Sequence, residues 1–226
     1  MSNFAIIMGD TGSGKSTSIK SLDPKETVIF NVLGKRLPFK GSAAAYNEGN
    51  HNLVKITMYK DLVAWLENIN TKAPHIKNIV IDDAIYIMRI EFFDRSTERG
   101  FDKYNELADH FRKIIATCGS LRDDLNVFML LHTEPVESDG ALIGYKSASV
   151  GKLLDKMYNP LESVAVTLFA QPKYDDKGIP TYGFYTHRRK INGIELPCKT
   201  PDGMFEEDFI PNDLGMVVKA MNEYYG

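Results

Sequence analysis

A glycine-rich segment near the start of the chain constrains the fold more than any other feature. Residues 9–16 read Gly-Asp-Thr-Gly-Ser-Gly-Lys-Ser, which satisfies the pattern G-x-x-x-x-G-K-[ST]. The segment follows an apolar run at residues 4–8 and precedes a predicted helix over 17–22, which the Asp23-Pro24 pair ends. A strand, a glycine loop and a helix in this order predict a P-loop in an α/β protein.

Each residue type in the loop has a physical reason to be there. Glycines let successive backbone N–H groups converge on phosphate oxygens, and the following helix adds its dipole. Lys15 is expected to reach the β and γ phosphates, and Ser16 to ligate Mg²⁺. The sequence therefore predicts ATP and Mg²⁺ as ligands. The predicted nucleotide-binding residues are Gly9, Asp10, Thr11, Gly12, Ser13, Gly14, Lys15, Ser16 and Thr17.

Short β-rich runs alternate with amphipathic runs, which predicts a mainly parallel central sheet flanked by helices. The expected strands are 4–8, 27–32, 53–57, 78–82 and 127–131, and the expected helices are 17–22, 61–70, 84–93 and 104–121. Two further β-like runs, 163–170 and 183–187, flank a hairpin turn within 174–178, and a terminal helix is expected over 212–224. No repeat or linker is visible, so one domain over 1–226 is expected.

Two segments leave structural alternatives open. The helix at 84–93 is apolar almost all round, so it lies either in the core or under a partner subunit. The stretch 132–151 is polar, carries glycine and lacks periodicity, so we expect a long loop.

A second motif lies at residues 79–83, Ile-Val-Ile-Asp-Asp, a hydrophobic strand that ends in acids. Ligands of open α/β folds bind at the carboxyl edge of the sheet, where these acids would lie. Asp82 is expected to hold Mg²⁺ through water. Asp83 is expected either to orient or deprotonate the attacking water, or to cap the following helix; the two roles are compatible.

Polar residues also follow the strand at 127–131. His132 or Thr133 is expected to sense the γ-phosphate. Glu134 is a second candidate base behind Asp83, the alternative being a solvated acid in a loop. The predicted catalytic set is Lys15, Asp83, His132 and Glu134.

Basic residues late in the chain suggest contacts with other molecules. His187, Arg188, Arg189 and Lys190 form the strongest cluster, and they are expected either to reach a nucleotide across a subunit interface, to touch a nucleic-acid backbone, or simply to be solvated. Lys146, Lys152 and Lys156, with Tyr145, could grip single-stranded DNA by charge and stacking, although Glu137, Asp139 and Asp155 lie in the same segment.

Composition limits the partners and the compartment. With 27 basic and 30 acidic residues the formal charge is −3, so a nucleic-acid contact requires a local patch. Two cysteines, Cys118 and Cys198, are too few for a disulfide framework and favour a reducing cytoplasm. The first ten residues lack the pattern of a signal peptide, and no apolar stretch approaches 18 residues, so no membrane association is expected.

The order of these motifs resembles that of the RecA-like P-loop ATPases. More narrowly, the chain is similar to phage-encoded RecA-like ATP-binding proteins grouped with the Sak-type single-strand annealing proteins. The resemblance spans nearly the whole chain. It is carried by IFNVLGKRLPFKG after the second strand, LLHTE, GKLLDK at 151–156 and the tail CKTPDGMFEEDFIPNDLGMVVKAMNEYYG.

The resemblance implies ATP-dependent binding and pairing of single-stranded DNA in phage recombination or replication, in the host cytoplasm. It also implies a homo-oligomeric ring or filament. By analogy, region 135–152, with Lys146 and Lys152, would contact DNA, and Arg188, Arg189 and Lys190 would act across the interface.

One departure affects the expected chemistry. RecA-like enzymes usually carry a catalytic glutamate after the second strand, yet this chain has no acid between Glu26 and Glu48. Hydrolysis must then depend on Asp83 or Glu134, or be slow. The leading hypothesis is therefore a DNA-coupled ATPase. The alternatives are a non-hydrolysing, nucleotide-gated annealing protein and, third, a P-loop kinase with Arg188 and Arg189 in its lid.

Overall fold

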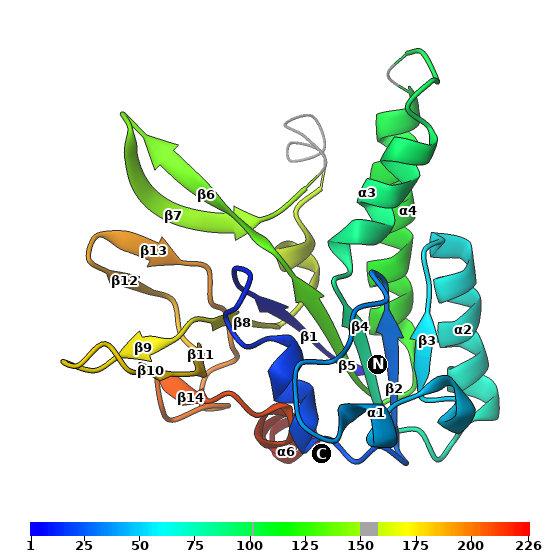
Figure 1. Cartoon of the computed structure of the whole chain (residues 1–226), viewed down its shortest axis with the longest axis horizontal. Helices are drawn as coiled ribbons and strands as arrows, with labels where there is room; N and C mark the ends of the chain where they lie inside the picture. Colours follow the sequence, from blue (N-terminus) through cyan, green and yellow to red (C-terminus); the bar gives the residue numbers. More distant parts are fainter. Residues whose placement is uncertain (101, 150–157) are drawn as a thin grey trace.

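The computed structural model describes residues 1–100, 102–149 and 158–226 (Figure 1). Its main sheet, within this part of the chain, has eight strands in the order β14-β11-β8-β1-β5-β4-β2-β3. The strands are β1 (Asn3–Met8), β2 (Thr27–Asn31), β3 (Leu53–Lys55), β4 (Asn78–Asp82), β5 (Asn126–Leu131), β8 (Val166–Ala170), β11 (Gly183–Tyr185) and β14 (Phe209–Pro211). The helical segments are η1 (Ser16–Ser21), α1 (Ser42–Ala45), η2 (Glu48–Asn50), α2 (Tyr59–Lys72), α3 (Ile85–Asp94), α4 (Asp102–Ser120), η3 (Pro160–Ser163) and α6 (Leu214–Tyr225).

The centre of this sheet is parallel. β1 pairs in parallel with β5 and β8, β4 with β5 and β2, and β2 with β3, whereas β11 pairs antiparallel with β8 and β14. Because parallel strands share one direction, the carboxyl ends of β1, β2, β4 and β5 meet at a single edge. The predicted α/β class, with a mainly parallel sheet, flanking helices and a terminal helix, is confirmed.

Both faces of the sheet are covered, which explains why its central strands are apolar throughout. In β1, Phe4, Ile6 and Met8 belong to one core, together with residues of α2, α3 and α4. Ala5 and Ile7 belong to the other core, together with residues of η1 and α6. Figure 1 shows α2, α3 and α4 on one side and η1 with α6 on the other. A strand buried on both faces has no polar face to alternate with.

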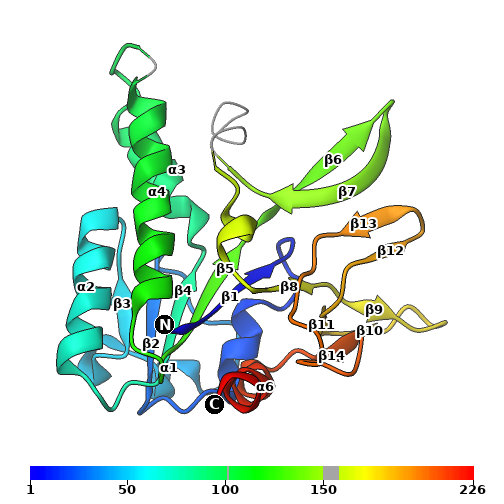
Figure 2. The ribbon, with the colours of Figure 1, turned by 180° about the vertical axis from the view of Figure 1, so that it is seen from behind.

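Helix α3 lies in the core for only part of its length. Ile85, Ile87 and Met88 are buried, whereas Phe93 near the other end is exposed. The helix packs against α4, and the two project together from the sheet (Figures 1 and 2). The core interpretation of segment 84–93 therefore holds for its first half.

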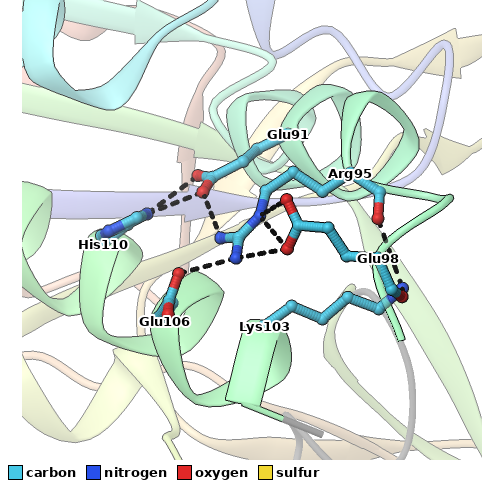
Figure 3. Close-up of polar contacts among 6 residues, drawn as sticks. All are labelled: Glu91, Arg95, Glu98, Lys103, Glu106 and His110. Carbon is cyan, nitrogen blue, oxygen red and sulfur yellow. Dashed lines mark hydrogen bonds and ion pairs between the residues drawn. The ribbon is translucent and has the colours of Figure 1, made fainter. Parts of the chain in front are cut away.

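Charged side chains join the outer halves of α3 and α4 (Figure 3). Arg95 forms ion pairs with Glu91 at 3.2 Å and with Glu98 and Glu106 at 2.7 Å each. Glu91 in turn contacts Nδ1 of His110 at 2.8 Å. One guanidinium shared by three carboxylates holds the pair of helices together where the apolar core ends.

The stretch after β5 is not the long loop that the sequence suggested. β6 (Thr133–Ser138) and β7 (Ala141–Ser147) form an antiparallel hairpin in which Ser138 pairs with Ala141. The two turn residues, Asp139 and Gly140, have φ of 52° and 78°. Asp-Gly with two positive φ values is a favoured two-residue hairpin turn. Most residues of the hairpin are at least partly exposed, so the strands lack the apolar alternation that identifies buried sheet.

The hairpin belongs to a second, smaller sheet that projects from the main one (Figures 1 and 2). Its order, among the residues described, is β12-β13-β7-β6, with β12 (Arg189–Ile191) and β13 (Ile194–Leu196) forming another hairpin. The predicted turn at 174–178 is confirmed: it joins β9 (Lys173–Tyr174) to β10 (Pro180–Thr181), beyond the β8–β11 pair.

The remaining helical predictions differ in detail. The predicted helix at 17–22 is a 3₁₀ helix, η1, that starts at Ser16. The terminal helix α6 begins at Leu214, and the carboxylate of Asp213 caps it by accepting from the backbone N–H of Met216. Asn3 at the start of β1 donates to Asn222 of α6 at 2.9 Å, so the two ends of the described chain lie side by side.

Candidate nucleotide-binding site

The P-loop follows β1 at the carboxyl edge of the sheet. Gly12 and Gly14 have φ of 81° and 96°, in the left-handed region that side chains with a Cβ rarely adopt. Among the described residues, the backbone N–H groups of Gly12, Gly14 and Ser16 have no acceptor in the protein. A loop that directs several unpaired N–H groups toward one point is suited to binding an anion. Because η1 is short, its dipole is small, and the capacity of the loop to bind an anion depends on these N–H groups.

Lys15 lies folded against its own loop. Its Nζ donates to the carbonyl oxygens of Gly9 at 2.6 Å and Asp10 at 2.9 Å, and the residue is 6% exposed. Burial lowers the pKa of Lys15 to about 8, although Asp83 and Asp82 nearby act in the opposite direction. A phosphate would supply the negative charge that this buried ammonium lacks.

Ser16 and Asp82 meet although they are 66 residues apart. The hydroxyl of Ser16 donates to Oδ1 of Asp82 at 2.9 Å. Burial raises the pKa of Asp82 to about 6, and the neighbouring Asp83 adds to the rise. A hydroxyl beside a carboxylate is the pair of protein ligands that Mg²⁺ uses when phosphates and waters complete its octahedron. The residues therefore fit the metal that the sequence predicted.

Asp83 faces this site rather than the helix that follows it. Its Oδ1 lies 2.8 Å from Nε2 of His132, and its Oδ2 lies 3.0 Å from Nζ of Lys35. Burial alone would raise the pKa of Asp83, but hydrogen bonds from His132 and Lys35 hold it below the usual value. The predicted capping role is not observed, since α3 has Ala84 at its N-cap and no side-chain cap.

The backbone of Asp83 is also unusual. Its φ is 60°, in the left-handed region. Residues with a side chain adopt this conformation infrequently, and Asp and Asn do so more readily than most. The turn directs the carboxylate toward β5 and the end of β2, where its two partners lie.

Of the three polar residues that follow β5, two lie at the site and one does not. His132 contacts Asp83, and the hydroxyl of Thr133 contacts the carboxylate of Asp10 in the P-loop, so both sensor candidates lie at the site. Glu134, the second candidate base, is directed elsewhere. It pairs with Arg89 at 3.7 Å and with Lys146 at 3.6 Å, and it does not line the cavity at the P-loop.

A cavity of about 490 Å³ joins these elements. Besides the P-loop, the two acids and His132, it is lined by Lys35, Arg36, Pro38, Tyr182 and Asn212. Asn212 donates to the carbonyl of Gly14 at 2.9 Å, and a Cβ on Gly14 would lie 2.7 Å from that amide nitrogen and 3.2 Å from the ring of Tyr182. The φ of Gly14 favours glycine, and a Cβ there would also displace the Asn212 amide from its present position.

These additional lining residues were not identified from the sequence. Lys35 and Arg36 follow Gly34 at the end of β2, so a basic pair after a strand was an available signal. Tyr182 and Asn212 reach the P-loop only because β11 and β14 lie on the same side of the sheet as β8, and no local pattern indicates that.

The predicted nucleic-acid or interface residues share the smaller sheet. Lys146 is on β7, and Arg188, Arg189 and Lys190 lie at the start of β12. Arg188 pairs with Glu195, and Arg189 pairs with Asp208 at 3.1 Å, so part of the positive charge is neutralised. Lys152 and Lys156 lie outside the described residues.

No family model and no curated protein matches this sequence. Within residues 1–100, 102–149 and 158–226, no three His, Cys, Asp or Glu side chains are grouped to hold a metal. In the same part of the chain, no helix has both the length and the apolar character needed to cross a bilayer.

Proposed function

We propose that this protein binds Mg-ATP at the P-loop and is a RecA-like ATPase. The contact between Ser16 and Asp82 carries the proposal, because it joins two motifs that the sequence could only suggest separately. Lys15 lies beside them, buried and close to both aspartates. A cation, a hydroxyl and a carboxylate around unpaired backbone N–H groups form the apparatus for a triphosphate and its metal.

The hydrolytic step would use the groups around Asp83. A water oxygen forms a bond to the γ-phosphorus while the bond from that phosphorus to the bridging oxygen of ADP breaks. Asp83 accepts a proton of the water, and His132, 2.8 Å away, stabilises the carboxylate before that transfer by donating a hydrogen bond to it. Mg²⁺ held by Ser16 and Asp82 would neutralise charge on the phosphates.

We propose single-stranded DNA as the partner and a ring or filament as the assembly. The support is the distribution of the basic residues. Lys146, Arg188, Arg189 and Lys190 all belong to the projecting sheet, whose strand β6 begins at Thr133 next to the P-loop. A local basic surface is what a chain of net charge −3 needs to hold a phosphodiester backbone.

One observation favours a second candidate function. Both oxygens of Asp83 are engaged, one by His132 and the other by Lys35. A carboxylate held in this way is a poor base. The protein would then be a nucleotide-gated annealing protein, in which ATP changes the conformation by differential binding and not by turnover.

Phosphate release from Mg-ATP, measured at fixed salt with and without single-stranded DNA, tests the proposal. We expect turnover that DNA stimulates and that Lys15→Ala abolishes. Loss of one buried charged partner should cost about 2–5 kcal/mol of binding. Turnover that persists in Lys15→Ala would remove the P-loop from the mechanism. Lys15-dependent binding without turnover would favour the nucleotide-gated alternative.

A further inference from the structure

Lys35 is held at the carboxyl edge of the sheet by its backbone. It follows Gly34, whose φ of 65° closes a turn in which the N–H of Gly34 donates to the carbonyl of Asn31 at 3.3 Å. The buried side chain of Asn31 then donates to the carbonyl of Lys35 at 2.6 Å. β2 runs parallel to β4, so this turn ends beside Asp82 and Asp83.

The side chain of Lys35 is much less constrained than its backbone. Its Nζ lies 3.0 Å from Asp83, yet 62% of the side chain is exposed. Asp83 is buried, with 10% of its side chain exposed, so the ammonium is the mobile half of this pair, and His132 still contacts the carboxylate if the ammonium leaves. Lysine suits such an exchange because its ammonium is a point charge on a flexible four-carbon stem.

Lys35 also lines the cavity that contains the P-loop, together with Arg36. It lies close enough to Lys15 for its charge to help lower the pKa of that residue. Three cations, Lys15, Lys35 and Arg36, thus line the same cavity as the carboxylates of Asp82 and Asp83. This excess of cations suits a ligand with several negative charges, and the charge a triphosphate adds over a diphosphate is on the γ-phosphate.

We propose that Lys35 is the γ-phosphate ligand of this site and determines its preference for triphosphate over diphosphate. When a triphosphate binds, the ammonium leaves Asp83 for the γ-phosphate, and the carboxylate is released to act on water. With a diphosphate, Lys35 remains on Asp83. The inference rests on the proposed function, because it requires a nucleotide at the P-loop.

The same exchange would regulate Asp83, the base that remains in the absence of a glutamate after the second strand. A base held by an ammonium until the γ-phosphate arrives is unavailable in the free protein and in the diphosphate state. Lys35 would thus supply in cis the positive charge that other phosphoryl-transfer sites take from an arginine finger.

The test compares the affinities of Mg-AMP-PNP and Mg-ADP for the wild type, Lys35→Ala and Lys35→Arg by titration calorimetry. For Lys35→Ala we expect the affinity for AMP-PNP to fall about 10- to 100-fold, the effect of one hydrogen bond to a charged group, while that for ADP changes less than about twofold. Lys35→Arg should retain most of the preference. Lys40→Ala is the matched control, since Lys40 is an exposed lysine five positions away that does not line the cavity, and it should change neither affinity.

An equal loss for both nucleotides, or no loss for AMP-PNP, would overturn the role of Lys35 and leave the proposed function in place. If the wild type binds neither nucleotide in a Lys15-dependent way, the proposed function and this inference both fail. Circular dichroism melting of each variant checks that the fold is intact, which the exposure of Lys35 leads us to expect.

Discussion

The two edges of the main sheet differ in what their cavities contain. The carboxyl edge has a cavity of about 490 Å³ lined by Lys15, Asp82 and Asp83. The amino edge has a larger one, of about 950 Å³, whose buried polar residues include Asn3 and Asn126.

The two edges differ in the kind of polar group that they bury. At the amino edge neutral amides satisfy one another: Asn3 donates to Asn126 at 3.2 Å, and Asn126 donates to Asn78 at 3.4 Å. At the carboxyl edge burial shifts the pKa values of Lys15 and Asp82 toward neutrality. Burying charged groups costs free energy, and strongly shifted pKa values cluster where a ligand or a reaction uses them.

The largest effect should come from Asp83→Asn. Asparagine tolerates a φ near 60° and keeps the shape of the side chain, but it cannot accept a proton. We expect ATP turnover to fall about 10²- to 10⁴-fold, the usual contribution of a general base, with the affinity for nucleotide changed much less. Single-turnover phosphate release and calorimetry measure the two quantities.

Glu134→Gln is the matched control for that substitution. Glu134 is the other candidate base, but Arg89 and Lys146 hold it away from the cavity. We expect turnover within about twofold of the wild type. A large loss in Glu134→Gln with full activity in Asp83→Asn would move the base to the projecting sheet and weaken the contrast between the two edges.

An intermediate effect should appear in the pH dependence of metal binding. Because the pKa of Asp82 is about 6 in the free protein, the carboxylate takes up a proton as the pH falls through that value. Metal must then displace the proton, so the affinity for Mg-ATP should fall up to about tenfold per pH unit below pH 6. Asp82→Asn should bind more weakly but lose this slope, which calorimetry across pH would show.

The raised pKa of Asp82 affects the stability of the free protein in the direction opposite to its effect on metal affinity. The folded-state pKa of Asp82 lies above its usual value of 3.8, so the folded state holds the proton more tightly. The contribution of Asp82 to stability is therefore present below pH 3.8 and is lost as the pH rises through 6. An affinity for Mg-ATP that is constant from neutral pH down to about pH 5 would show that Asp82 stays ionised over that range, and a full affinity in Asp82→Asn would exclude it as a metal ligand.

The sequence predicted the buried half of the molecule well. The bounds of β4 are those expected, Asn78–Asp82, and the P-loop, Asp82 and the polar end of β5 lie together as the parallel order implied. Strands that are buried on both faces are apolar throughout, so their sequence alone marks them. The glycine motif fixes the loop between them.

The sequence did not predict the parts that depend on exposed strands or on distant packing. The β6–β7 hairpin was missed because its strands are largely exposed, although Asp139-Gly140 was a usable turn signal. Lys35 reaches Asp83 only because β2 pairs with β4. Tyr182 and Asn212 reach Gly14 only through the packing of the last strands.

The smallest effect on the nucleotide site should come from the amino edge. Asn126→Ala removes a buried amide that accepts from Asn3 and donates to Asn78, so it leaves two buried polar groups without that partner. We expect a loss of about 1–3 kcal/mol in the free energy of unfolding and a fall of about 2–12 °C in Tm. The exposed Asn68→Ala in α2 is the control and should leave the Tm nearly unchanged. If the amides serve only to join the strands, the affinity for Mg-ATP measured well below the Tm should be that of the wild type. An affinity that falls further than the destabilisation explains would mean that the larger cavity also acts on the nucleotide.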